Sequence, residues 1–234
     1  MLMGPQNLPE RLNEVCDRIA AAARGAGRTV DSITLLAVTK GQSAELVRAA
    51  AGAGVRNFGE SYLQEALEKR ASVSDLELTW HFIGRLQANK TRPVAESFAW
   101  VHGVDRLKIA ERLSEQRPYY APLLNVCLQV NVGGEESKGG VGLAGLPALA
   151  SSVAALPRLK LRGLMCLPPV ERDPARQRGW FAKLREALEA LNETGMGLDT
   201  LSMGMSADFE AAILEGATLV RVGTALFGPR ILPG

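Results

Sequence analysis

The chain has 234 residues, of which 47% are hydrophobic and 22% charged, and its formal net charge is +2. This near-neutral balance and an aromatic content of 5% argue against nucleic-acid binding, which needs a basic surface and stacking side chains. No stretch reads as a signal peptide or a membrane-spanning helix, so we expect a soluble cytoplasmic protein. The length predicts a single domain over residues 1–234.

The cysteines and histidines are few and widely spaced. Cys16, Cys127 and Cys166 are an odd number, which favours reduced, packed thiols over a disulfide framework. His81 and His102 lie too far apart in sequence to suggest a metal site. We therefore expect no metal.

Helical and strand-like segments alternate along the chain. A helix over 8–24 comes first, because its apolar residues recur at helical spacing. The predicted strands are 33–40, 55–58, 78–83, 98–102, 123–132, 159–166, 198–202 and 218–222. The predicted helices between them are 43–53, 60–71, a turn after 84, 105–116, 143–156, 174–192 and 206–215. This pattern predicts an α/β fold, a single (β/α)₈ TIM barrel preceded by an N-terminal helix. An open doubly wound sheet is the alternative, without a glycine-rich dinucleotide motif to support it.

The first predicted strand, Ile33–Lys40, is almost continuously apolar and stops on a lysine. Parallel strands covered on both faces have this composition, and barrels place their chemistry at the carboxyl ends of such strands. An amine held against an apolar wall loses its proton more easily and can attack an aldehyde or ketone. The alternative is that Lys40 is simply the first solvated residue after the strand. Lys138, in the glycine-rich segment 133–140, is a second candidate amine or part of a solvated loop.

Two segments near the end of the chain suggest a phosphate site. Gly204 and Ser206 follow the seventh strand, with Ser206 expected to cap the next helix, and Gly223 and Thr224 follow the eighth. Barrels commonly bind phosphate between these two loops, although ordinary capping and a plain turn would also explain the residues. Arg221 lies within the last strand, where a buried guanidinium needs an acceptor such as a ring nitrogen or an acidic ligand group. A carbonyl for Lys40 and a phosphate for these loops fit pyridoxal 5′-phosphate (PLP) or a phosphosugar.

Several motifs then suggest a family. They are Leu36-Ala37-Val38-Thr39-Lys40, Asn57-Phe58-Gly59-Glu60-Ser61-Tyr62, Trp80-His81-Phe82-Ile83-Gly84, Arg162-Gly163-Leu164-Met165, Gly204-Met205-Ser206 and Arg221-Val222-Gly223-Thr224. Over nearly its whole length the chain resembles the pyridoxal phosphate homeostasis proteins (YggS/PROSC family). Their barrel is the one shared with the N-terminal domain of alanine racemase, the PLP-dependent fold type III.

The resemblance implies a set of cofactor-binding residues. They are Lys40 as the internal aldimine, Ser206, Gly223 and Thr224 at the phosphate, Arg221 at the pyridine nitrogen, and Asn57 and Met165 along the ring. An arginine at the ring nitrogen keeps it unprotonated, which weakens the ring as an electron sink. One departure is Gln42, which stands where better-known members often have a second lysine.

The resemblance also implies a function. The protein would carry and buffer PLP on Lys40 and maintain vitamin B6 homeostasis without catalysis, handing the cofactor to apo PLP-enzymes as transient partners. A monomer is expected, with a dimer as the alternative. An amino-acid racemase of the alanine racemase type is the competing interpretation, but it needs a second acid/base group. The chain's tyrosines are Tyr62, Tyr119 and Tyr120, and the last two are expected at the wrong end of the barrel. A Schiff-base aldolase acting on a phosphosugar is a third possibility, and the placement of Arg221 argues against it.

Overall fold

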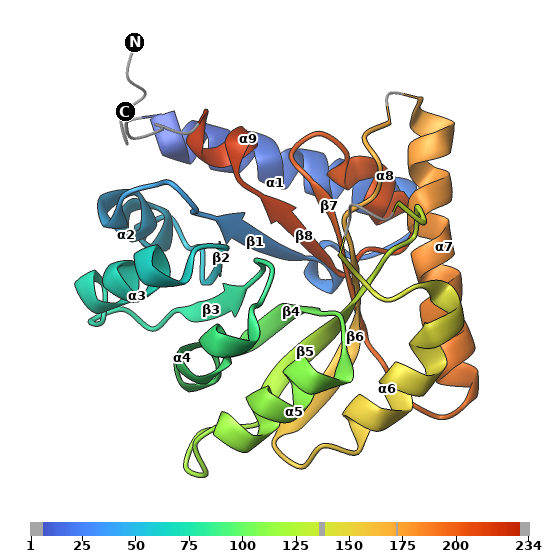
Figure 1. Cartoon of the computed structure of the whole chain (residues 1–234). Helices are drawn as coiled ribbons and strands as arrows, with labels where there is room; N and C mark the ends of the chain where they lie inside the picture. Colours follow the sequence, from blue (N-terminus) through green and yellow to red (C-terminus); the bar gives the residue numbers. More distant parts are fainter. Residues whose placement is uncertain (1–6, 136–138, 172, 230–234) are drawn as a thin grey trace.

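The computed structural model describes residues 7–135, 139–171 and 173–229. Within these ranges eight parallel strands form a closed barrel in chain order, with β8 hydrogen bonded to β1 (Figure 1). The strands are β1 (Thr34–Val38), β2 (Asn57–Glu60), β3 (Thr79–Phe82), β4 (Trp100–Val104), β5 (Leu124–Val130), β6 (Leu159–Cys166), β7 (Thr200–Met205) and β8 (Leu219–Val222). The predicted barrel is confirmed, and closure makes the first and last strands neighbours.

The helices lie outside the barrel, and those between the first and the last helix connect successive strands (Figure 1). In the described residues the α-helices are α1 (Leu8–Gly25), α2 (Ala44–Gly52), α3 (Leu63–Ser72), α4 (Thr91–Ser97), α5 (Leu107–Gln116), α6 (Leu146–Ala154), α7 (Pro174–Glu193), α8 (Phe209–Leu214) and α9 (Thr224–Phe227). Side-chain hydrogen bonds explain where some of these helices begin. The Ser43 side chain accepts a hydrogen bond from the Leu46 N–H, and Asp173 caps α7 by accepting from Ala175 N–H at 2.9 Å, with Pro174 following.

The N-terminal helix is confirmed and completes one side of the molecule. Residues at helical spacing, among them Leu12, Val15 and Ile19, are buried, and α1 lies against α8 and α9. These residues belong to the main core between the helices and the outer faces of the strands. The first helix therefore supports the two loops after β7 and β8.

The inside of the barrel is more polar than this outer core. His102 on β4 and Ser202 on β7 are hydrogen bonded at 2.8 Å although their strands are not neighbours. Both side chains must therefore point into the barrel. Arg221 on β8 reaches the same region and is 4% exposed.

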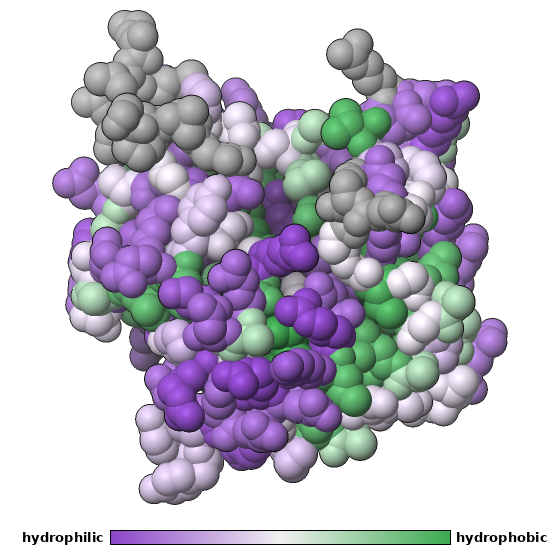
Figure 2. All heavy atoms as spheres, viewed as in Figure 1, coloured by the Kyte–Doolittle hydropathy of each residue, from purple (hydrophilic) through white to green (hydrophobic). Residues whose placement is uncertain are grey.

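The outer surface is mixed in character. Figure 2 shows hydrophilic side chains over much of the face seen in Figure 1, with apolar side chains between them. None of the helices in the described part of the chain is long and apolar enough to cross a membrane.

Candidate functional site

A cavity of about 260 Å³ opens at the carboxyl ends of the strands. Its walls come from the ends of β1, β2, β3, β6, β7 and β8 and the residues that follow them. The lining residues are Val38, Lys40, Gln42, Ser61, Ile83, Leu167, Met205, Ser206, Ala207, Arg221, Gly223, Thr224 and Gly228. This is the end of the barrel at which the sequence predicts the chemistry.

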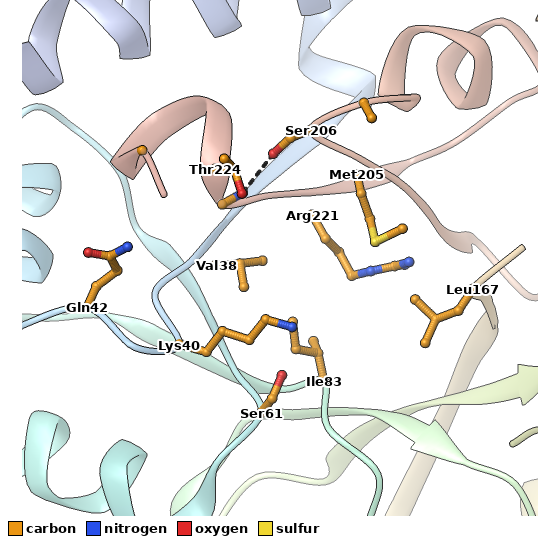
Figure 3. Close-up of a pocket in the computed structure, with 13 residues that line it drawn as sticks. Val38, Lys40, Gln42, Ser61, Ile83, Leu167, Met205, Ser206, Arg221 and Thr224 are labelled. Atoms are coloured by element: carbon orange, nitrogen blue, oxygen red, sulfur yellow. Dashed lines mark hydrogen bonds between the residues drawn. The ribbon is translucent and has the colours of Figure 1, made fainter. Parts of the chain in front are cut away.

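Lys40 lies in a tight turn directly after β1. The Gln42 N–H donates to the Thr39 carbonyl at 2.9 Å, and Gly41 has a φ of +72°. Glycine adopts this left-handed conformation without steric cost, so the chain can reverse immediately after the lysine. Figure 3 shows the Lys40 side chain extending along the cavity toward Ile83, with Ser61 beside it. Lys40 is partly buried, and its amine faces the cavity.

A buried ion-pair network holds the backbone on both sides of Lys40. Lys69 on α3 lies 2.6 Å from Glu60 and 2.6 Å from Glu65. The Thr39 hydroxyl donates to Glu60 at 2.7 Å, and the Gly41 N–H donates to Glu65 at 2.6 Å. The turn that carries Lys40 is thus fixed by side chains of β2 and α3.

The protonation of Glu60 depends on this network. Burial raises the pKa of the Glu60 carboxyl, while the charge and hydrogen bond of Lys69 act in the opposite direction. Removing the ammonium would leave a buried carboxylate without its counter-ion. Sequence reasoning does not find this network, because Lys69 has the spacing of an ordinary exposed helix residue.

The two phosphate-type loops meet, but differently from the prediction. Ser206 does not cap the helix that follows it, because α8 begins at Phe209 with Asp208 before it. Instead the Ser206 Oγ accepts hydrogen bonds of 3.2 Å from the N–H groups of Gly223 and Ala225. Ser206 therefore binds the start of α9, a single-turn helix that the sequence does not predict. The Ser206 hydroxyl, with its hydrogen still to donate, and the Thr224 hydroxyl line the cavity where the two loops meet; we call this place the anion-binding corner.

Gly223 has a steric reason to be glycine. A Cβ at this position would lie 3.2 Å from the Val38 carbonyl oxygen on the neighbouring strand. Thr224 follows it and is exposed at the mouth of the cavity. The loop can therefore come close to both the barrel wall and a ligand.

Arg221 is buried and takes its acceptors from the protein. It donates to the Ser202 carbonyl at 2.6 Å, to the Ser202 Oγ at 2.8 Å and to the Cys166 carbonyl at 2.8 Å. The expectation that a ligand must supply an acceptor is therefore wrong for these N–H groups. Burial lowers the pKa of Arg221 and raises the pKa of Cys166 to about 12, so the neighbouring thiol stays protonated and the guanidinium is the cation here.

Two predicted residues do not line this cavity. Asn57 is the first residue of β2 and lines a separate cavity of about 280 Å³ at the amino ends of the strands. Met165 lies within β6 and is 1% exposed. The structure thus brings together Lys40, Ser206, Arg221, Gly223 and Thr224, and leaves Asn57 and Met165 in the barrel interior. Lys138 lies outside the described residues.

Sequence reasoning also missed several wall residues, namely Val38, Ser61, Ile83, Leu167 and Met205. All five lie at or just beyond a strand end. The predicted barrel already places the carboxyl ends of its strands at one end of the molecule. The position of these residues at strand ends was therefore a usable signal even without a motif.

The chemistry of the cavity is narrow. Among the described residues that line it, Lys40 and Arg221 are the only ones with a basic side chain, and no lining residue has a carboxyl, imidazole or phenol group. The arrangement offers one amine for a carbonyl, one fixed cation, and hydroxyl and backbone donors for an anion. Within the described ranges, no cluster of three or more histidine, cysteine or acidic residues could hold a metal ion.

Comparison with known proteins assigns this barrel to a class. Residues 15–231 match the family model described as alanine racemase, N-terminal domain. The chain is 60% identical over 223 residues to the pyridoxal phosphate homeostasis protein of Pseudomonas aeruginosa, covering 95% of this chain and 96% of that one. It therefore belongs to the pyridoxal phosphate homeostasis protein family, as the sequence motifs predict.

Solved structures agree with this assignment. PipY of Synechococcus elongatus, solved with PLP bound, is 37% identical with a TM-score of 0.80, over 92% of this chain and 100% of that one. An alanine racemase from Corynebacterium glutamicum is 18% identical with a TM-score of 0.68, over 95% of this chain and 63% of that one. The second likeness supports the fold alone.

Proposed function

We propose that this protein binds PLP reversibly at Lys40 and acts as a carrier and buffer of the cofactor in vitamin B6 homeostasis, without turning over a substrate. The observation that carries the proposal is the composition of the cavity: one amine and one fixed cation next to an anion-binding corner, with no further acid/base side chain among the lining residues. A second support is the family itself, whose P. aeruginosa member is named a pyridoxal phosphate homeostasis protein.

The residues present fit the cofactor. Lys40 offers its amine to the aldehyde. Ser206 and Thr224 offer hydroxyl donors to the phosphate from the two loops that meet at α9, and the Gly223 N–H holds the Ser206 hydroxyl in place. Arg221 lies between these ends on the cavity wall, where it would face the ring nitrogen (Figure 3). We retain Asn57 and Met165 in the proposal as barrel-interior residues that support the site, and not as direct contacts of the ring.

The protein's own groups account for holding without turnover. The Lys40 amine would bond to the aldehyde carbon with loss of one water molecule, and water would reverse this step. A competing amine would instead take the lysine's place on that carbon and free the Lys40 amine without water. Bound PLP would supply a weaker electron sink for carbanion chemistry when its ring nitrogen is unprotonated. The buried cation of Arg221 opposes protonation of that nitrogen. The site is thus built for attachment and release.

The racemase alternative requires an acid/base group on each face of the substrate. Tyr119 and Tyr120 precede β5, at the amino end of the barrel, and are 89% and 79% exposed. Tyr62 follows β2 on the correct side but does not line the cavity. An aldolase would likewise need such a group beside Lys40. We therefore place both below the carrier function.

Release would deliver PLP to apo-enzymes that need it. Gln42 lines the rim of the cavity, where it supplies no amine to assist transfer. A free amine from solution or from a recipient enzyme would then do so. We propose that the protein acts as a monomer, with these enzymes as transient partners.

The test is attachment at one lysine. The purified protein incubated with PLP should become yellow, and borohydride should fix the label on the peptide that contains Lys40. The Lys40→Arg variant should stay unlabelled, whereas Lys90→Arg, at an exposed lysine outside the cavity, should behave as wild type. A labelled protein that also racemises L-alanine at an enzymatic rate would favour the racemase. Absence of label on Lys40 in the folded protein would contradict PLP attachment.

A further inference from the structure

Both histidines of the chain lie inside the barrel, outside the cavity described above. The sequence contains two, His81 on β3 and His102 on β4, and they are 1% and 0% exposed. Neither lines the mouth at Lys40. Buried imidazoles are held by hydrogen bonds, so their partners indicate what they do.

The partners form one continuous chain through the barrel interior. His81 Nε2 lies 3.1 Å from Asn57 Oδ1, and His81 Nδ1 lies 3.0 Å from His102 Nε2. His102 Nδ1 lies 2.8 Å from Ser202 Oγ, which also accepts from Arg221 at 2.8 Å. The chain thus runs from the amino ends of the strands, where Asn57 and His81 line the second cavity, to the arginine in the wall of the first.

The donors and acceptors give this chain a direction. Arg221 can only donate, so Ser202 Oγ accepts from it and has its own hydrogen to give. His102 Nδ1 is the acceptor within reach, which leaves the hydrogen of His102 on Nε2. His102 then donates to His81 Nδ1, and His81 donates from Nε2 to Asn57 Oδ1. In the reverse direction His81 Nε2 would carry no hydrogen, and it would face Asn57 Oδ1 as a second acceptor.

We propose that Ser202, His102, His81 and Asn57 form a one-directional hydrogen-bonded chain that fixes the guanidinium of Arg221, which makes His102 a positioning residue for the ring end of the cofactor site. The first half of this proposal concerns the protein alone. The second half rests on the proposed function, because it assigns Arg221 to bound PLP.

Burial and packing support the same arrangement. Burial lowers the pKa of His81 to about 3, and it holds the pKa of His102 well below its usual value, with the charge of Arg221 acting in the same direction. Trp100 stacks on His81 with ring centroids 5.3 Å apart and an angle of 11° between the planes. Both imidazoles are therefore neutral, and His81 is also held in its plane.

Because the protein has only two histidines, nitrogen NMR of histidine-labelled, tag-free protein can test the direction of the hydrogen-bonded chain without ambiguity. In the protein without PLP, both imidazoles should be neutral and carry their hydrogen on Nε2 at pH 7. A hydrogen on Nδ1 of either ring, or a charged ring, would overturn the proposal whether or not PLP binds.

Ser202→Ala tests the link to Arg221. It should change the His102 signals and weaken PLP binding by about tenfold, the usual effect of losing a hydrogen bond to a charged group. Ser202→Thr keeps the hydroxyl, so its His102 signals and its PLP affinity should match those of wild type. Ser114→Ala is the matched control, since Ser114 is also a buried serine, but it bonds the Arg158 N–H far from the site.

The outcomes separate the two proposals. Unchanged histidine signals and a PLP affinity within twofold of wild type in the Ser202→Ala variant would overturn the positioning role. If wild-type protein carries the expected hydrogens but takes up no PLP, the proposed function fails and the direction of the chain stands. If Ser202→Ala does not fold, the signals of the wild-type protein still decide the direction, and Ser202→Cys, whose thiol is only a weak donor and acceptor, decides the link by its PLP affinity.

Discussion

Ser206 and Gly223 are 17 residues apart in sequence, yet the Ser206 Oγ accepts a 3.2 Å hydrogen bond from the Gly223 N–H. This bond joins the loop after β7 to the loop after β8. The same oxygen receives the Ala225 N–H, so one hydroxyl organises the start of α9. The anion-binding corner is therefore a joint between two loops.

Replacing Ser206 with alanine should weaken binding of PLP by about tenfold, since it removes an acceptor that orders two N–H groups and a donor for the phosphate. Equilibrium titration followed by absorbance measures this change. Ser152→Ala, at an exposed serine on α6, is the control and should leave the affinity unchanged. Equal affinities for the Ser206→Ala variant and wild type would remove Ser206 from the site.

Replacing Lys69 with methionine should lower the free energy of unfolding by about 3–5 kcal/mol, because Glu60 would be left buried without its counter-ion. Urea denaturation gives this value, and Lys90→Met at an exposed lysine provides the control. Adding Glu60→Gln to the Lys69→Met variant should restore part of the loss. If the double variant were less stable than Lys69→Met alone, the charge explanation would be contradicted.

The buried histidines predict acid sensitivity. The pKa of each is lower in the folded state than in the unfolded chain, so the unfolded state binds more protons as the pH falls below about 6.5. Each histidine should therefore reduce the free energy of unfolding by up to about 1.4 kcal/mol per pH unit down to its folded pKa, which for His81 is about 3. Denaturation of wild type and His81→Asn between pH 7 and pH 5 measures the slope.

The comparison with His81→Asn is needed because Glu60 changes the free energy of unfolding with pH in the opposite direction. Its pKa is raised by burial, so its contribution is present at low pH and lost as the pH rises. The variant retains Glu60 and lacks one histidine, so its slope should be shallower than that of wild type. Identical slopes would mean that His81 binds protons equally in the folded and unfolded states, which would contradict the lowered pKa.

Gly204→Ala should destabilise the protein by about 1–3 kcal/mol, since left-handed backbone disfavours a side chain and the site is crowded. Gly204 has a φ of +89°, and a Cβ there would lie 2.7 Å from the Ala212 Cβ and 2.9 Å from the Phe209 Cα. Gly52→Ala provides the control, because a Cβ at that position would meet no neighbouring atom within 4 Å. It should be neutral or slightly stabilising. Thermal unfolding of both variants measures this difference in stability, and equal Tm values would contradict it.

The sequence was most informative about the barrel and about the positions at strand ends. Continuous apolar runs such as 33–40 marked buried parallel strands, and the position of Lys40 followed from where such a run stops. Short elements were harder to predict. The four-residue helix α9 is held by Ser206 from another loop, and local sequence carries no sign of that contact.

The buried polar contacts were beyond reach for a related reason. Lys69 on α3 and Glu60 on β2 pair only after the helix packs against the barrel. His102 and Ser202 are 100 residues apart, and their hydrogen bond depends on both side chains pointing inward across the barrel. Periodicity identifies which residues are buried on a helix or strand, but not which polar partners meet in the interior.

Because the barrel closes between its first and last strands, the site is completed only at the end of the synthesis of the chain. Lys40 follows the first strand, Arg221 belongs to the last, and Leu36 on β1 pairs with Arg221 on β8. A chain emerging from the ribosome has its lysine early but lacks the adjoining wall, which β8 and the loop after it provide, until residues 219–225 have been synthesised. The pocket is therefore complete only on a finished barrel, and any ligand that binds it would favour the closed ring over partly assembled forms.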